Sequence, residues 1–198
     1  MQIALATTNQ GKIEEIQAIL AGPDIDWLTC ADVDDWPQIE ETGTTFLDNA
    51  RLKARAIAGR FGIPALADDS GLEVDVLDGR PGLNSARFAG PEATDADNVN
   101  ALAEELRAGG LKGSPARFQA AVVLAWPDGR EVAAGGVCEG RVVLEPRGEA
   151  GFGYDPIFIP DGFDETMAEL GSGRKNALSH RGRALRALKR RLDEEGPG

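Results

Sequence analysis

Five short segments place cations, acids and flexible backbone where they could bind an anion or a metal. The first is Thr7-Thr8-Asn9-Gln10-Gly11-Lys12, at the junction of a predicted strand and a predicted helix. Free backbone N–H groups and the helix dipole make such a junction an anion site, and Gly11 lets the backbone approach closely. Lys12 opposes the dipole, so a bound anion explains its position better than helix stability does. A polar loop with a solvated lysine is the alternative.

The second segment is a pair of glutamates, Glu40 and Glu41, that precedes a helix carrying Phe46, Asn49 and Lys53. The three helix residues are spaced by three and four positions and therefore share one face. A helix that only covers a core would be apolar on that face, so this mixed stripe indicates the wall of a cleft. A solvated face with Lys53 in water is the alternative.

The third segment is Asp68-Asp69-Ser70-Gly71, which follows three apolar residues and is expected at the carboxyl end of a buried strand. Open α/β sheets bind ligands at such ends, and paired carboxylates suit Mg²⁺. The alternative is an Asx turn, for which the same residues are also well suited.

The fourth segment is the loop Phe152-Gly153-Tyr154-Asp155, with glycines around two aromatic residues and an acid. Such a loop could leave an aromatic face open for stacking with a base, with the carboxylate accepting from ring N–H groups. Loops of this composition are also common as packed turns.

The fifth segment joins Lys175 to His180 and Arg181, at the start of the last predicted helix. Cations in the first turn oppose the helix dipole, so we expect an acceptor or an anion near them. His180 is the single histidine of the chain, and we expect it to be exposed at the helix start.

The elements that must position these segments follow from hydrophobic periodicity and capping signals. Strands are predicted at about residues 2–6, 64–67, 72–76, 117–126, 130–134 and 157–159. Helices are predicted at about residues 12–21, 46–60, 95–107 and 180–194. Helices interleaved with strands indicate an α/β fold, and the hairpin around residues 127–129 favours a mixed central sheet over a purely parallel one.

Length and composition limit the function classes. At 198 residues the chain fits one domain, 1–198, or two lobes that share a sheet. A net charge of −12 argues against duplex nucleic acid, whereas lysines and arginines gathered in a cleft could still bind a small phosphorylated metabolite. No signal peptide or membrane span is apparent, and the two cysteines lack metal spacing, so we predict a cytoplasmic protein with reduced cysteines.

The segments together carry a family resemblance. In order along residues 5–188, the chain contains TTNQGK, ETGTTFLDNARLKA, ADDSGLEVD with RPGLNSARFAG, GFGYDP, and MAEL with SHRGRAL. These motifs closely resemble the signatures of the HAM1/RdgB family, the inosine and xanthosine triphosphate pyrophosphatases. The resemblance implies an elongated α/β fold with a mixed central sheet, a nucleotide cleft between two lobes, a Mg²⁺ cofactor and a homodimer. It also implies hydrolysis of ITP, dITP and XTP to the monophosphate and pyrophosphate.

Residue roles are carried over from the same motifs. The resemblance implies that Glu41 and Asp69 bind the metal, that Asp69 is also the proton acceptor with Asp68 as its neighbour, and that Lys53 faces the triphosphate. The remaining matches are substrate-binding positions, either on the phosphate loop or near the base: Thr7, Thr8, Asn9, Gln10, Gly11, Lys12, Ser70, Phe152, Gly153, Tyr154, Asp155, Lys175, His180 and Arg181.

Two other function classes are weighed against this one. A pyrophosphatase of the Maf type, which acts on pyrimidine or modified nucleotides, should begin with a serine-rich loop and paired arginines, and TTNQGK has neither. A nucleotide sensor without catalysis would keep the phosphate loop but lose the acids, whereas Glu41, Asp68 and Asp69 are all present.

Overall fold

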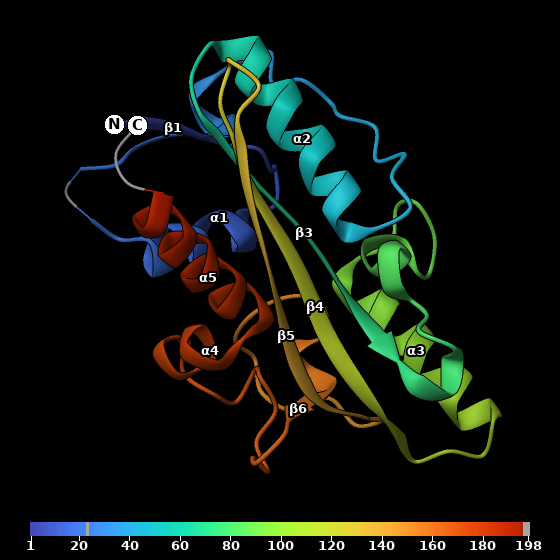
Figure 1. Cartoon of the computed structure of the whole chain (residues 1–198). Coiled ribbons are helices and arrows are strands. Elements are labelled where there is room, and N and C mark those ends of the chain that lie inside the picture. Colours follow the sequence, from blue (N-terminus) through green and yellow to red (C-terminus); the bar gives the residue numbers. More distant parts are fainter. Residues whose placement is uncertain (23, 196–198) are drawn as a thin grey trace. The chain divides into compact units, whose positions relative to one another are not determined.

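The computed structural model, which describes residues 1–22 and 24–195, has a mixed sheet with flanking helices (Figure 1). Six strands lie in the order β2-β1-β3-β4-β5-β6. β1 is parallel to β2 and β3, whereas β5 and β6 are antiparallel. The α/β fold with a mixed central sheet is therefore confirmed.

The element bounds are as follows. The strands are β1 Gln2–Leu5, β2 Asp26–Leu28, β3 Ala65–Val74, β4 Gly113–Ala125, β5 Glu131–Val143 and β6 Phe158–Pro160. The helices are α1 Gln10–Ile19, α2 Phe46–Phe61, α3 Asp95–Ala108, α4 Ser172–Leu178 and α5 His180–Glu195. Short 3₁₀ turns are η1 Cys30–Asp32, η2 Asp75–Leu77, η3 Gly82–Arg87 and η4 Asp155–Ile157.

Capping signals in the sequence located two helices closely. Thr45 caps α2, which ends at Gly62 in a left-handed conformation with φ 68°. Thr94 and Asp97 form the capping box of α3. β2 and α4 were not predicted, because both are short and carry little periodicity. Within the described part of the chain, no helix has the length and apolar character needed to cross a bilayer.

β3 corrects the prediction in the region of the paired acids. The sequence predicted two strands, at about 64–67 and 72–76, with the paired acids at the carboxyl end of the first and a turn as the alternative. Ala65–Val74 is instead a single strand, and Asp68 and Asp69 lie within it rather than at its end. The turn chemistry of Asp-Asp-Ser-Gly is overridden because β3 is bonded on both sides, to β1 and β4. The strand can bury two adjacent acids because cations from neighbouring helices pair with them.

The chain divides into two compact units. Of the described residues, unit 1 comprises 1–22, 24–69, 120–136 and 181–195, and unit 2 comprises 70–119 and 137–180. Each unit has its own apolar core, and β3, β4 and β5 contribute residues to both. A single domain over 1–198 stays a prediction.

Unit 1 is layered, with helices on both faces of its strands (Figure 1). On one face, α1 and α5 pack through Ile13, Ile16 and Leu185 against Leu66 of β3. On the other face, the alanines and Ile57 of α2 pack against residues that include Ala65 and Ala67 of β3. We call these the α1/α5 face and the α2 face.

Candidate active site

The two acids of β3 point to opposite faces of the unit 1 sheet. Successive side chains of a strand alternate between faces, and Leu66 lies on the α1/α5 face whereas Ala67 lies on the α2 face. Asp68 therefore faces α1 and α5, and Asp69 faces α2. Asp68 is 0% exposed and Asp69 is 7% exposed. Each acid requires partners of its own because a buried carboxylate is costly without them.

On the α2 face, Asp69 belongs to a cluster with Glu41, Asn49 and Lys53, which we call the Asp69 cluster. Lys53 Nζ lies 2.8 Å from Asp69 Oδ1 and 2.8 Å from Glu41 Oε1, and it donates to the Asp68 carbonyl oxygen at 3.0 Å. Asn49 Nδ2 donates to Asp69 Oδ2 at 3.2 Å. Asn49 and Lys53 therefore do share a polar face, as the sequence predicted, and that face meets carboxylates rather than water.

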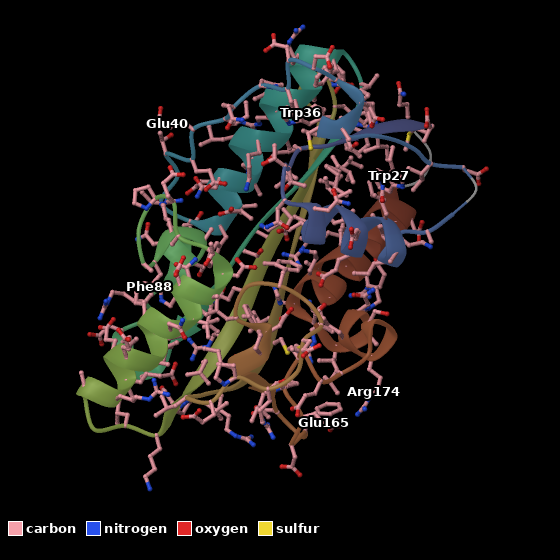
Figure 2. All side chains as sticks on the ribbon, turned by 180° about the vertical axis from the view of Figure 1, so that it is seen from behind. Trp27, Trp36, Glu40, Phe88, Glu165 and Arg174 are labelled. Atoms are coloured by element: carbon pink, nitrogen blue, oxygen red, sulfur yellow. The ribbon has the colours of Figure 1, made fainter. Side chains whose placement is uncertain are left out.

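The loop before α2 brings Glu41 into this cluster. Glu40 is exposed and lies on the outside of the loop (Figure 2), so the two glutamates differ in environment. Upstream, Trp36 packs on Phe61 near the end of α2, with ring centroids 5.2 Å apart. Gly43 N donates to Asn49 Oδ1 at 2.8 Å, which ties the loop to the first turns of α2.

On the α1/α5 face, Asp68 belongs to a cluster with Lys12, Glu15 and Arg181, which we call the Asp68 cluster. Lys12 Nζ lies 2.7 Å from Asp68 Oδ2, and Arg181 Nη2 lies 3.1 Å from the same oxygen. Arg181 Nη1 lies 2.5 Å from Glu15 Oε2. The acceptor that the sequence predicted near Arg181 is present as the carboxylate of Asp68, which also pairs with Lys12. A bound anion at Lys12 stays a prediction.

Burial and charge act in opposite directions on the pKa values of the Asp69 cluster. Burial raises the pKa of Asp69, and the attraction of Lys53 offsets only part of this rise. Burial lowers the pKa of Lys53, but Asp69 and Glu41 outweigh that effect and the pKa is raised. The cluster therefore combines a lysine that stays charged with a carboxylate that is more basic than an ordinary aspartate.

The Asp68 cluster shows the reverse pattern for its carboxylate. Burial alone would raise the pKa of Asp68, but Arg181 and Lys12 outweigh it and hold the pKa far below its ordinary value. Burial lowers the pKa of Lys12 despite the attraction of Asp68. The pKa shifts of the two adjacent acids therefore have opposite directions: the pKa of Asp68 is lowered by the two cations that it pairs with, and the pKa of Asp69 is raised.

The loop before α1 presents polar groups at the surface of unit 1. Thr8, Asn9 and Gln10 are exposed, and Thr7 and Gly11 are partly buried. Asn9 caps the helix, with its Oδ1 accepting from Lys12 N at 3.0 Å. The predicted strand, polar loop and helix are all present, although α1 begins two residues earlier than predicted.

In unit 2, Asp155 forms a cluster with Phe152 and Lys175, which we call the Asp155 cluster. Asp155 Oδ2 accepts from Phe152 N at 2.9 Å and lies 2.5 Å from Lys175 Nζ. Lys175 Nζ also lies 4.7 Å from the centroid of the Phe152 ring, a cation–π contact. A Cβ at Gly151 would lie 2.2 Å from Asp155 Oδ2, so glycine is required there.

Three other predicted site residues lie in unit 2. Tyr154 is 3% exposed and its hydroxyl donates to the Ser85 carbonyl oxygen at 2.9 Å, so its ring belongs to the core. Gly153 N donates to Asp95 Oδ2 at 2.7 Å. Ser70 is partly buried in β3.

His180 corrects the prediction of exposure. Its side chain is buried, at 7% relative exposure, and its ring stacks on Phe118 with centroids 4.7 Å apart and 10° between the planes. The helix start therefore packs on β4 instead of facing water, because the aromatic ring gains more from stacking than from solvation. From its position at the helix start this contact could not be inferred.

Comparison with known proteins assigns this arrangement to a family. Residues 3–191 match the model described as the Ham1 family. The chain belongs to the Ham1 family. It is 48% identical over 189 residues to a dITP/XTP pyrophosphatase of Halalkalibacterium halodurans, covering 96% of this chain and 97% of that protein. It is 49% identical over 187 residues to a dITP/XTP pyrophosphatase of Rhodospirillum centenum, covering 94% and 92%.

Solved structures agree with the Ham1 assignment. A HAM1 protein from Coxiella burnetii superposes with a TM-score of 0.85 at 41% identity, covering 98% of this chain and 99% of that one. The Staphylococcus aureus Ham1 protein superposes with a TM-score of 0.84 at 37% identity, covering 98% and 100%. The resemblance found in the motifs is therefore confirmed.

The Asp69 cluster of this Ham1 protein fits the predicted Mg²⁺. Glu41 Oε1 and Asp69 Oδ1 lie 2.8 Å from the same ammonium nitrogen, so both oxygens already converge on one cation. Mg²⁺ prefers oxygen ligands and commonly takes one or two carboxylates together with substrate phosphates. Among residues 1–22 and 24–195 there is no group of three or more acidic, histidine or cysteine side chains arranged for a metal. Water and substrate phosphate oxygens would supply the other ligands.

Sequence reasoning missed the role of Glu15. Glu15 lies on α1 three residues after Lys12, and its carboxylate meets Arg181 from a distant part of the chain. The spacing of three placed Glu15 and Lys12 on one helix face, which was a usable signal. Nothing in the sequence indicated that Arg181 would be the partner of Glu15, because the two residues are 166 positions apart in the chain.

Proposed function

We propose that this chain hydrolyses dITP, XTP and ITP to the corresponding monophosphate and pyrophosphate. Its membership of the Ham1 family and its identity to two dITP/XTP pyrophosphatases support the activity. The observation that carries the proposal is the Asp69 cluster, in which two carboxylates converge on one cation. Phosphoanhydride hydrolysis requires this combination of acids for a metal and lysines for phosphate charge.

The negative charge of the triphosphate is balanced by lysines and by N–H donors of the loop before α1. When bound by Glu41 and Asp69, Mg²⁺ neutralises charge on the phosphate oxygens. Lys12 and Lys53 offset the remaining charge, and the exposed start of α1 contributes backbone N–H donors. Thr7, Thr8, Asn9, Gln10 and Gly11 form this phosphate loop.

Asp69 activates the attacking water. Its raised pKa makes it a better proton acceptor than an ordinary aspartate. The water oxygen bonds to the α-phosphorus, the proton passes to Asp69, and the bond to the bridging oxygen breaks so that pyrophosphate leaves. Lys53 holds the Asp69 carboxylate from one side during this step. Asp68 lies on the opposite face of β3, where its carboxylate forms an ion pair with Lys12 and so holds the lysine in position.

The base is held by groups of unit 2. The partly exposed Phe152 ring provides a stacking surface, with Gly153 giving the backbone room and buried Tyr154 supporting the loop. Hypoxanthine and xanthine present a 6-oxo acceptor and a protonated N1, whereas adenine presents a 6-amino donor. Lys175 and His180 suit the oxo group, Asp155 suits N1–H, and Ser70 is a further polar contact.

A substrate panel tests the proposed function. Pyrophosphate release from dITP, ITP, XTP, ATP, GTP, dUTP and TTP is measured with MgCl₂ and again with EDTA. We expect the 6-oxo substrates without a 2-amino group, dITP, ITP and XTP, to exceed ATP in kcat/KM by about 10- to 100-fold or more, because a mismatched buried polar group costs about 1–3 kcal/mol. Preference for the pyrimidine nucleotides, or release of single phosphates, would contradict the proposal.

We expect Lys53→Ala and Lys12→Ala to weaken binding of ITP about 10- to 100-fold more than binding of IMP, because both ammonium groups act on the triphosphate. Lys53→Ala also leaves Glu41 and Asp69 facing each other without the ammonium that lies 2.8 Å from both. Lys112→Ala is the control, since Lys112 is exposed in unit 2 and outside the three clusters. Calorimetry measures the affinity of each variant for ITP and for IMP. If the ratio of the two affinities is the same in a variant as in the wild-type protein, the lysine has no phosphate role.

We further propose that the protein acts as a cytoplasmic homodimer. The substrates are metabolites of the nucleotide pool, and the resemblance to the family implies a dimer. Light scattering on the full chain should give twice the mass of one chain, and a mass that stays monomeric across a dilution series would contradict the dimer.

A further inference from the structure

A buried amide joins the loop that carries Glu41 to the strand that carries Asp69. Asn49 is 2% exposed and lies in the first turns of α2. Its Oδ1 accepts from Gly43 N at 2.8 Å, and its Nδ2 donates to Asp69 Oδ2 at 3.2 Å. One side chain therefore bonds both segments that supply the carboxylates of the Asp69 cluster.

The orientation of this amide is fixed by its partners. A backbone N–H can only donate, so the group facing Gly43 must be the carbonyl oxygen of Asn49. That places the Nδ2 donor against Asp69, whose ionised carboxylate can only accept. Lys53, one turn further along α2, donates to the other oxygen of Asp69 at 2.8 Å. Two donors on one helix thus hold the two carboxylate oxygens and define the plane of the group.

The loop approaches Asn49 too closely for any residue but glycine. A Cβ at Gly43 would lie 2.6 Å from Asn49 Oδ1 and 2.6 Å from Asp48 Cβ. Both distances are well below van der Waals contact, so a side chain there must displace the loop. Because Glu41 is two residues before Gly43, the bond to Asn49 also limits where the Glu41 carboxylate can lie.

We propose that Asn49 is a positioning residue for hydrolysis: it sets the plane of the Asp69 carboxylate and pins the loop so that Glu41 and Asp69 converge on one cation. The inference rests on the proposed function, because convergence matters only if the two acids serve a common reaction. Asn49 acts through Asp69 and Glu41 and does not itself touch the reacting atoms.

The chain contains a matched control. Asn98 of α3 is also 2% exposed, and its amide also makes two hydrogen bonds, accepting from Ala89 N at 2.8 Å and donating to the Ala86 carbonyl oxygen at 3.1 Å. Its partners are backbone groups of unit 2 instead of an acid of the Asp69 cluster. Asn98→Ala therefore reports the general cost of losing a buried, doubly bonded asparagine.

The experiment compares Asn49→Ala with Asn98→Ala in the full chain, using dITP with MgCl₂. We expect both to lower the melting temperature by similar amounts, and Asn49→Ala alone to lower kcat by about 10- to 100-fold, the usual effect of removing a group that orients a metal-binding carboxylate. KM for dITP should stay within about twofold, since substrate contacts are untouched. Hydrogen exchange of the nucleotide-free protein should speed up in residues 40–46 for Asn49→Ala and not for Asn98→Ala.

The variant Asn49→Asp distinguishes the effect of the hydrogen bond to Gly43 from that of the hydrogen bond to Asp69. It also provides a test if Asn49→Ala does not fold. An aspartate retains the acceptor for Gly43 N but loses the donor to Asp69, so the exchange of residues 40–46 should stay slow while kcat still falls. Equal kcat losses in Asn49→Ala and Asn98→Ala, or full kcat in Asn49→Asp, would overturn the positioning role. If the wild-type protein releases no pyrophosphate from dITP, it is the proposed function that fails, which the wild-type assay shows by itself.

Discussion

Replacing Asp69 with asparagine is expected to lower kcat for dITP by about 10²- to 10⁴-fold, the usual contribution of a proton acceptor. The change keeps the shape of the side chain while removing both the charge for the metal and the site for the proton. The fold should survive, because Lys53 keeps its bonds to Glu41 at 2.8 Å and to the Asp68 carbonyl oxygen at 3.0 Å. Single-turnover assays with dITP measure the chemical step, and calorimetry with the same nucleotide shows that binding persists.

Asp26→Asn is the control for this prediction. Asp26 is also a strand aspartate of unit 1, but it is exposed and bonded to Gln2 at the surface. Its replacement should leave kcat unchanged. Near-normal turnover in Asp69→Asn would show that another acid accepts the proton, and Glu41 would then be the next residue to replace.

Replacing Arg181 with alanine is expected to destabilise the protein by about 3–5 kcal/mol, the range found when one partner of a buried ion pair is removed. Arg181 is 2% exposed, and its guanidinium lies 3.1 Å from Asp68 and 2.5 Å from Glu15. Its removal leaves Asp68, which is fully buried, with one fewer cation. Urea unfolding monitored by circular dichroism gives the change. Arg190→Ala, at an exposed position of the same helix, should change stability by less than about 0.5 kcal/mol.

The pH dependence of this loss follows from the pKa of Asp68. Arg181 and Lys12 lower that pKa below its ordinary value, so the stabilisation is complete above about pH 4, the ordinary pKa, and declines as the pH falls further. The difference in stability between wild type and Arg181→Ala should therefore stay constant from neutral pH down to about pH 4 and narrow as the pH is lowered further. A difference that also stays constant below about pH 4 would mean that the loss comes from packing and not from the ion pair.

Arg181→Ala also separates two roles for this residue. The resemblance to the family implies a contact with the base, whereas the structure gives Arg181 two carboxylate partners. If Arg181 reads the base, the kcat/KM values for ITP and ATP should converge in the variant. If it serves to hold Asp68 and, through it, Lys12, both values should fall by the same factor.

The sequence predicted α2 and α3 closely because their boundaries are set by local chemistry. Thr45, Gly62 and the pair Thr94 and Asp97 act on backbone groups within a few residues, so their effect can be read without knowing the fold. β3 was divided wrongly for the opposite reason. Its Asp-Asp-Ser-Gly stretch favours a turn locally, and the pairing with β1 and β4 that overrides this preference is made by distant segments.

The sequence by itself determined the family and the α/β class with a mixed sheet, because these depend on residue types in a fixed order along the chain. Only the tertiary structure decided how the paired acids divide. The alternation of a single continuous strand sends Asp68 to Lys12 and Arg181 and sends Asp69 to Lys53, so neighbours in sequence acquire opposite pKa shifts. Burial and charge pairing are properties of the surroundings in three dimensions, and they give a lowered pKa to one aspartate and a raised pKa to the other where the sequence shows two identical residues.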